Sequence, residues 1–219
     1  MVNSCLDIPE VTLSAVFEAL NSIKSKAVGP DQLSIAQLKG VPFLLRHLQT
    51  LFRASLREGS VPLLLKEVRL TTVPKKQTPT TLPDFRPTAV ASCLMKTLEK
   101  LLAKHITSYA EDLNLFHDNQ YGFRTGLGTD TTILHLLEYV RKGFDASLIT
   151  LALFIDLRRA FECIPHCCIL SELKRIGASE KLIEWFSSFL SNRVFTVVGL
   201  MVCRDGGISV IGVYPRVLA

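Results

Sequence analysis

The stretch that decides the fold lies at residues 148–162 and reads LITLALFIDLRRAFE. Its first eight residues carry no charge and are rich in Leu and Ile, which predicts a β-strand buried on both faces. Asp156 follows directly at the carboxyl end of this strand. Phosphoryl transfer with two metal ions needs carboxylates on such a rigid edge, because Mg²⁺ prefers oxygen ligands in near-octahedral geometry. The alternative interpretation is that Asp156 caps the helix that follows.

Helices are predicted on both sides of this strand. Apolar residues recur there at the three- and four-residue spacing of an amphipathic helix, and Gly59 stands where one of these helices would end. Before the strand, the predicted helices cover residues 11–22, a segment that starts near Ser34, and residues 41–58, 94–112 and 129–142. After it, they cover residues 167–176 and 180–190.

Fewer strands than helices are predicted. Residues 67–73 alternate apolar and polar side chains as a short strand does, and residues 195–213 are typical of a hairpin that turns at residues 205–207. The Thr- and Pro-rich residues 77–83 predict a loop. No linker separates these segments, so we expect an α+β fold in one continuous body.

Composition leaves room for an anionic partner. The 219 residues are 48% hydrophobic, which is enough for a sizeable core, and carry a net charge of +5. Residues 64–105 hold eight Lys and Arg against three Asp and Glu, so that 8 − 3 = +5 equals the surplus of the whole chain. Such a stretch suits phosphate contact. A basic face that is merely solvated is the alternative.

The six cysteines are expected to be reduced thiols in an intracellular protein. Acidic residues interrupt the N-terminus, so no secretory leader is predicted. No apolar run approaches the roughly 18 residues of a membrane span, so no membrane partner is expected. A group of four residues could suggest zinc, but no second ligand pair follows at zinc-finger spacing. They are Cys163, His166, Cys167 and Cys168.

Short motifs occur along the chain in one order. They stand at residues 26–31, 73–76, 84–90, 96–100, 120–126, 153–162 and 189–193. In this order the chain resembles the reverse transcriptases of non-LTR (LINE-type) retrotransposons. Each motif by itself is weak, whereas the ordered series is specific to the family.

The resemblance implies a role for the segment that ends the predicted strand. Asp156 would be the catalytic, metal-binding carboxylate, and the Leu157 carbonyl would be a second oxygen ligand of Mg²⁺. Phe161 would lie under the incoming sugar, where an aromatic ring excludes a 2′-hydroxyl and so selects deoxynucleotides. The alternative for Phe161 is a core aromatic residue.

The resemblance also implies residues that contact nucleotide and template. Lys75, Lys76 and Arg86 would face the triphosphate of a dNTP, and an exposed basic loop is their alternative. Four residues of the next motif would lie along the template, where charge and aromatic stacking hold single strands, and a turn without a ligand is their alternative. They are Gln120, Gly122, Phe123 and Arg124.

As a whole, the resemblance implies a right-hand polymerase. N-terminal helices and fingers would occupy residues 1–145 and a partial palm residues 146–219, truncated before the paired-aspartate motif. Two departures are visible: Glu162 replaces an Asp, and residues 212–218 lack the Gln and Gly of a Pro-Gln-Gly turn. We therefore expect an RNA-directed DNA polymerase fragment that is inactive by itself. The family resemblance implies Mg²⁺ as the cofactor, and dNTP, an RNA template and a DNA primer as partners. It also implies a location in the cytoplasm and nucleus.

Two further expectations follow from an incomplete palm. The strand at residues 148–155 would have an unpaired edge, which predicts self-association. The alternative function is a non-enzymatic RNA-binding remnant, or a relic without a selected role, because the paired-aspartate motif that would supply the family's remaining metal-binding carboxylates is missing.

Overall fold

The computed structural model describes residues 5–78, 84–157, 160–202 and 208–218. The chain forms two compact units, which we treat separately. Unit 1 comprises Met1–His105 with His166–Ala219, and unit 2 comprises Ile106–Pro165. The expectation of one continuous body is therefore wrong, because contacts concentrate within these two units. Unit 2 crosses the proposed boundary at residue 145, and that functional division stays a prediction.

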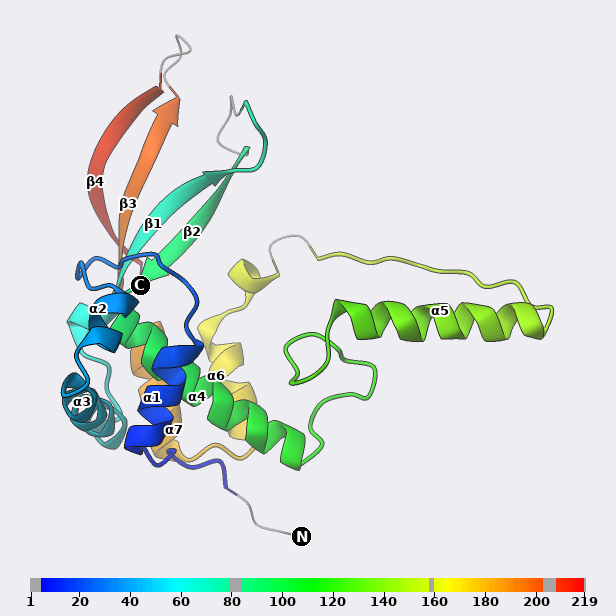
Figure 1. Ribbon diagram of the computed structural model, residues 1–219, viewed down its shortest axis with the longest axis horizontal. Helices are drawn as coiled ribbons and strands as arrows, with labels where there is room; N and C mark the ends of the chain where they lie inside the picture. The colour runs from blue at the N-terminus through cyan, green and yellow to red at the C-terminus, as the bar shows by residue number, and fades with distance from the viewer. Residues whose placement is uncertain (1–4, 79–83, 158–159, 203–207, 219) are drawn as a thin grey trace. The chain divides into compact units, whose positions relative to one another are not determined.

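A four-stranded mixed sheet organises unit 1 (Figure 1). Its order is β2-β1-β3-β4, with β1 and β3 parallel and the outer pairs antiparallel. The strand predicted at residues 67–73 and the C-terminal hairpin are confirmed, while the turn at residues 205–207 lies outside the described residues. The strands are β1 Glu67–Pro74, β2 Phe85–Ala91, β3 Arg193–Val202 and β4 Ile208–Leu218.

Strand β2 was not predicted from the sequence. It pairs with β1 so that Pro87 faces Thr72 and Ala91 faces Val68. Proline lacks the N–H that a central strand donates, so its presence argues against a strand unless the strand lies at an edge. β2 is an edge strand of the sheet, which removes the objection.

The predicted helices are all present. Ser34 and Gln37 form a reciprocal capping box at the start of α2, and Gly59 ends α3 in the left-handed conformation with a φ of 66°. α4 continues from unit 1 into unit 2. The bounds are α1 Leu13–Ser22, α2 Ile35–Gly40, α3 Leu44–Glu58, α4 Cys93–Asp112, α5 Thr129–Asp145, α6 His166–Arg175 and α7 Glu180–Leu190.

The core of unit 1 forms around Trp185. Its ring stacks on Phe189 at 5.4 Å between centroids, and its indole N–H donates to the buried Ser55 hydroxyl at 2.9 Å. That hydroxyl in turn donates to the Ser60 carbonyl at 2.6 Å. The indole N–H is therefore satisfied without water, as a buried polar group requires. This contact joins α3 to α7 across 130 residues of sequence.

The segment at residues 26–31 is fixed against the junction between β2 and α4. The Ser92 hydroxyl donates to the Asp31 carboxylate at 2.5 Å, and the Lys96 ammonium donates to the Ala27 carbonyl at 3.2 Å. A Cβ added to Gly29 would lie 2.7 Å from the Ser92 Cα and 2.9 Å from the Ala91 carbonyl oxygen. Glycine is therefore required here because another backbone occupies the space of a side chain.

We expect Gly29→Ala to lower the free energy of unfolding of unit 1 by about 1–3 kcal/mol, because the new methyl group must displace backbone atoms. The single tryptophan, Trp185, lies in the core of this unit, so urea denaturation followed by its fluorescence measures the change. Gly40→Ala is the matched control, since nothing lies within 4 Å of its Cβ position. Equal urea midpoints for the two variants would contradict the prediction.

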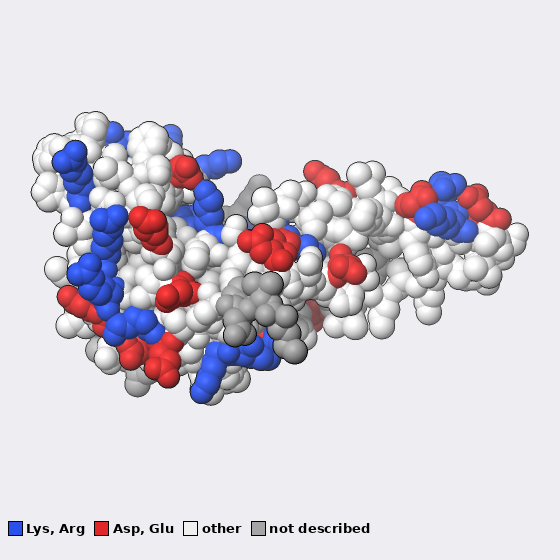
Figure 2. Space-filling view, turned by 90° about the horizontal axis from the view of Figure 1, so that it is seen from below, with Lys and Arg blue, Asp and Glu red and all other residues white. Residues whose placement is uncertain are grey.

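Unit 2 consists of the end of α4, a loop, α5 and an extended segment. None of the residues of α5 is buried, so its apolar stripe, which includes Ile133 and Leu137, stays exposed at 49% and 58%. Figure 2 shows the charges gathered at the end of this helix, where Arg141 pairs with Glu138 at 2.9 Å and with Asp145 at 2.7 Å.

The strand predicted at residues 148–155 is wrong in this structure. Residues 148–157 are extended but lie in no helix or strand, and Ile149 and Leu151 are 98% and 92% exposed. The physical reason is that a strand exists only when another strand pairs with its backbone groups. Residues 148–157 belong to unit 2, whereas all four strands of the described sheet belong to unit 1.

The fold class is nevertheless the predicted one, a mixed α+β chain with seven α-helices and a small mixed sheet among the described residues. Within that part of the chain, none of the helices combines the length and the apolar character needed to cross a lipid bilayer.

Candidate functional site

The hairpin of β1 and β2 brings together the three cations predicted to face a triphosphate. Arg86 is exposed on β2 opposite Val73 of β1, and Lys75 and Lys76 follow directly after the end of β1. The Lys75 backbone N–H donates to the Asp84 carbonyl at 2.7 Å, and the Lys76 ammonium pairs with the Asp84 carboxylate at 2.9 Å. The Lys76 side chain remains 52% exposed, and exposed ion pairs of this kind are weak. An incoming anion could therefore compete for this lysine.

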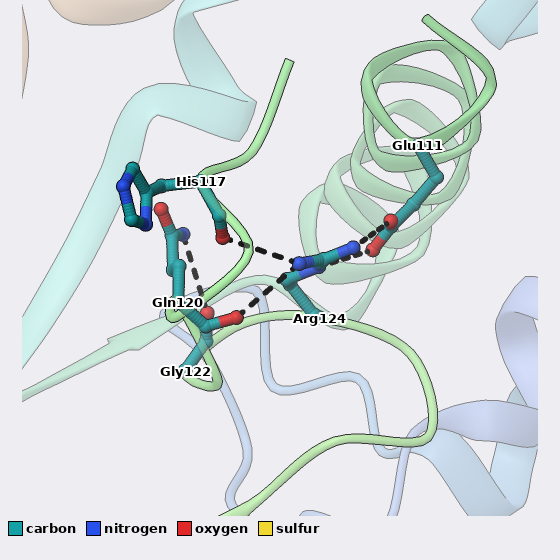
Figure 3. A network of polar contacts seen from close by, with 5 residues as sticks. All are labelled: Glu111, His117, Gln120, Gly122 and Arg124. Atoms are coloured by element: carbon teal, nitrogen blue, oxygen red, sulfur yellow. Dashed lines mark hydrogen bonds and ion pairs between the residues drawn. The ribbon is translucent and has the colours of Figure 1, made fainter. Parts of the chain in front are cut away.

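The predicted template residues lie in the loop that follows α4 in unit 2. The Gln120 side-chain amide donates to the Gly122 carbonyl at 3.4 Å, and the Gln120 backbone N–H donates to the His117 carbonyl at 2.9 Å. These bonds fold the loop into a tight turn (Figure 3). Phe123 follows with a φ of 63°, a conformation that is uncommon for a bulky residue.

Arg124 is held by Glu111, the second-last residue of α4. Its Nε and Nη2 atoms donate to the two Glu111 oxygens at 3.0 and 2.7 Å, a two-point contact (Figure 3). Its Nη1 atom donates to the carbonyls of His117 and Gln120, both at 3.4 Å. The hydrogen bonds from Arg124 lower the pKa of Glu111, and the pair stays charged at neutral pH.

Nothing in the sequence signalled Glu111. It lies 13 positions from Arg124 and on another element, so no helical or strand periodicity relates the two residues. The planar fork of an arginine matches both oxygens of a carboxylate, which makes this contact strong and directional. The structure therefore places the predicted template residue Arg124 in a contact within the protein.

Phe123 and Phe161 meet edge to face. Their ring centroids are 6.0 Å apart at an interplanar angle of 79°, and the two residues are 84% and 78% exposed. Phe161 begins the short 3-10 helix η3, Phe161–Cys163. It is not the core aromatic residue of the alternative interpretation. The structure thus brings a predicted nucleotide residue and a predicted template residue into contact.

A pocket of about 380 Å³ adjoins Phe123. Aromatic rings, glycines and threonine hydroxyls form its walls. The lining residues are Tyr121, Gly122, Phe123, Leu127, Gly128, Thr129, Thr132 and Ile133. The Tyr121 hydroxyl and the His135 Nδ1 atom form a hydrogen bond of 2.5 Å, which connects this side of the pocket to α5.

Asp156 and Leu157 lie on the exposed extended segment, where Leu157 is 73% exposed. A carboxylate and a carbonyl are oxygen donors of the kind that Mg²⁺ prefers. However, no group of three His, Cys, Asp or Glu side chains that could hold a metal occurs in the described ranges. Asp156 and the Leu157 carbonyl therefore offer two oxygen donors of the right chemistry, without a cluster of further metal-ligating side chains among the described residues.

A buried charged group in unit 1 was also missed from the sequence. Lys66 is 5% exposed and donates to the Ser188 hydroxyl at 3.2 Å. Burial lowers the pKa of Lys66, and the nearby positive charge of Arg193 lowers it further. Burial raises the pKa of Glu99, although the positive charge of Arg193 acts in the opposite direction. Parallel pairing of Glu67 with Val194 brings Lys66 close to Arg193. The two cations are far apart in the sequence, so only the tertiary structure brings them together.

Comparison with known proteins gives one consistent family. Residues 73–208 match the family described as reverse transcriptase (RNA-dependent DNA polymerase). This range holds the hairpin cations, the Arg124 loop, Asp156 and Phe161.

Individual relatives come from mobile elements. The chain is 28% identical over 195 residues to the probable RNA-directed DNA polymerase from transposon BS of Drosophila melanogaster, with 88% of this chain and 21% of that protein covered. It is 28% identical over 191 residues to the RNA-directed DNA polymerase from mobile element jockey of Drosophila funebris, with 85% and 21% covered. A Pol polyprotein from type-1 retrotransposable element R2 of Popillia japonica is 26% identical over 179 residues, with 82% and 24% covered.

The chain thus spans about a fifth of the length of the first two of these curated relatives. The match covers more than half of the chain, and the relatives are retrotransposon polymerases, as the ordered motifs indicated. The chain belongs to the reverse transcriptase family, within the group found in non-LTR retrotransposons.

Proposed function

We propose that this chain is the nucleotide- and template-handling part of an RNA-directed DNA polymerase. The observation that carries the proposal is the family match over residues 73–208, a range that includes every candidate site residue. The proposed partners are an RNA template, a DNA primer and dNTP, in the cytoplasm and nucleus. Residues 1–145 would form the N-terminal helices and the fingers of a right-hand polymerase, and residues 146–219 would form part of its palm.

Each candidate residue for nucleotide or metal binding has a proposed task. Lys75, Lys76 and Arg86 bind the triphosphate, since compact ammonium charges and a guanidinium fork both suit phosphate oxygens. Phe161 excludes a 2′-hydroxyl by its bulk, and Asp156 with the Leu157 carbonyl provides oxygen ligands for Mg²⁺. When bound, this ion would stabilise negative charge on the phosphoryl group.

A second candidate function is RNA binding without catalysis. It is favoured by the exposed position of Asp156 and by the lack of a metal-ligand cluster among the described residues. Both functions need a surface that contacts phosphate, so the hairpin cations are tested first.

We expect the triple variant Lys75→Ala, Lys76→Ala, Arg86→Ala to bind single-stranded RNA more weakly and with less salt dependence. Each phosphate contact on a single strand contributes about 0.7 to the slope of log affinity against log salt, so the slope should fall by up to about 2. Fluorescence anisotropy at a series of salt concentrations gives both quantities.

The matched control removes three exposed cations elsewhere in unit 1, as Lys39→Ala, Arg46→Ala, Arg57→Ala. It makes the same change in net charge and should retain most of the slope. If the hairpin variant and the parent show the same affinity and slope, the hairpin does not contact phosphate.

A further inference from the structure

We propose that Glu111 is a positioning residue: through Arg124 it fixes the loop so that the Phe123 ring can stack on an unpaired base of single-stranded RNA. The inference deepens the proposed handling of the template, for which the family resemblance implies a contact by Phe123, and it rests on that proposed function. It assigns Arg124 to the support of this loop instead of to the template phosphates.

The hydrogen bonds of Arg124 support this assignment. Two guanidinium nitrogens face the Glu111 carboxylate and the third faces the His117 and Gln120 carbonyls (Figure 3). The Phe116 ring lies 5.3 Å from the guanidinium carbon, and the Arg124 side chain is only 19% exposed. To bind a phosphate, this guanidinium would have to break the hydrogen bonds and the ion pair that already neutralise its charge.

The backbone conformation of Phe123 depends on these contacts between Arg124 and Glu111, which we call the clamp, because Phe123 is the residue directly before Arg124. Its positive φ persists only where the surroundings hold the backbone, and the Arg124 contacts provide that hold. The ring itself is 84% exposed and touches Phe161 edge to face, so most of its surface is open. The adjoining pocket of about 380 Å³ falls in the range of sites that accept small ring systems.

An unpaired base is the partner that this chemistry favours. Every base has a flat π-face, so stacking on an aromatic side chain binds single strands without sequence preference. The Arg124 charge beside the ring is paired with Glu111, and phosphate attraction at this point is weak. The contribution of the clamp to RNA affinity should therefore not vary with salt, in contrast to that of the hairpin cations.

The test is a double-mutant cycle on the whole chain, with fluorescent oligo(rA) of about twelve nucleotides as the probe. Phe123→Leu should weaken binding about fivefold or more, the loss expected for one stacked base. Glu111→Gln should weaken it about threefold, even though it removes a negative charge and would strengthen purely electrostatic binding. The double variant should bind no more weakly than Phe123→Leu alone, because Glu111 acts through the ring.

The matched control is Glu138→Gln in the same unit. Glu138 also pairs with an arginine, and the Arg141 hydrogen bonds lower the pKa of Glu138 to about 2, but its ion pairs are with residues of its own helix, α5. This variant should bind oligo(rA) at least as tightly as the parent. A polyphosphate probe, which has charge but no bases, should bind the Glu111→Gln variant at least as tightly as the parent.

Hydrogen exchange of residues 113–128 separates positioning from loss of structure. The swapped pair Glu111→Arg, Arg124→Glu should restore both protection and RNA affinity, and restored protection without affinity would overturn the proposal. Unchanged affinity in Glu111→Gln, with weaker binding in Phe123→Leu, would overturn the clamp but keep the template role. Unchanged binding in Phe123→Leu would overturn both.

Discussion

A purified chain of residues 1–219 is expected to extend no primer on an RNA template, and its Asp156→Ala variant should be indistinguishable from it. Two-metal phosphoryl transfer positions the attacking and leaving oxygens through ions held by a set of carboxylates. Asp156 is the only residue of this sequence to which the family resemblance assigns a place in that set. The described residues contain no group of three metal-ligating side chains that could hold an ion.

The position of Asp156 strengthens this expectation. It lies on an extended segment outside any strand, between the highly exposed Ile155 and Leu157. Catalysis of this kind is almost entirely positioning and charge stabilisation, so misplaced or missing ligands cannot be offset by contacts elsewhere. If the hairpin cations and the Phe123 loop make the proposed contacts, the chain should therefore bind substrates without turning them over.

Primer extension with Mg²⁺ or Mn²⁺ tests the expectation directly. A known reverse transcriptase on the same template and primer shows that the assay can detect synthesis. Extension by the parent that disappears in Asp156→Ala would contradict the expectation. It would also mean that another carboxylate, such as Glu162 or Asp205, completes the site.

Self-association at tens of micromolar is the second large effect that we expect, and Leu151→Lys with Leu153→Lys should abolish it. Residues 146–155 carry no charge, Pro or Gly, and the two leucines are 92% and 81% exposed. An exposed, apolar segment that pairs with no described strand is a template for pairing with a second copy. Two positive charges oppose that pairing, and at exposed positions they should leave the fold intact.

Sedimentation velocity measures the effect, with the parent expected as oligomers and the variant as monomer. Ala36→Lys with Ala54→Lys is the matched control, because both positions are exposed on other elements and the charge change is the same. That control should associate like the parent. A sharp monomer peak for the parent, together with a cooperative thermal transition, would show that residues 148–155 do not drive association.

The sequence by itself determined the helices of this protein. α7 has the predicted bounds, and α4 begins one residue before the predicted start. A helix bonds each residue to one four positions away, so periodicity and local caps such as Ser34 are sufficient to locate it. The family could also be read from the sequence, because its motifs are short and stand in a fixed order.

Only the tertiary structure decided the strands and the support of the site. Residues 148–155 have the composition of a buried strand but no described strand pairs with them, whereas β2 forms despite Pro87 because β1 offers a partner. The Glu111–Arg124 contact and the burial of Lys66 beside Arg193 likewise join groups from separate elements. Such contacts join residues that are distant in the sequence and form only when the intervening loops close. A local pattern of residues therefore cannot predict them.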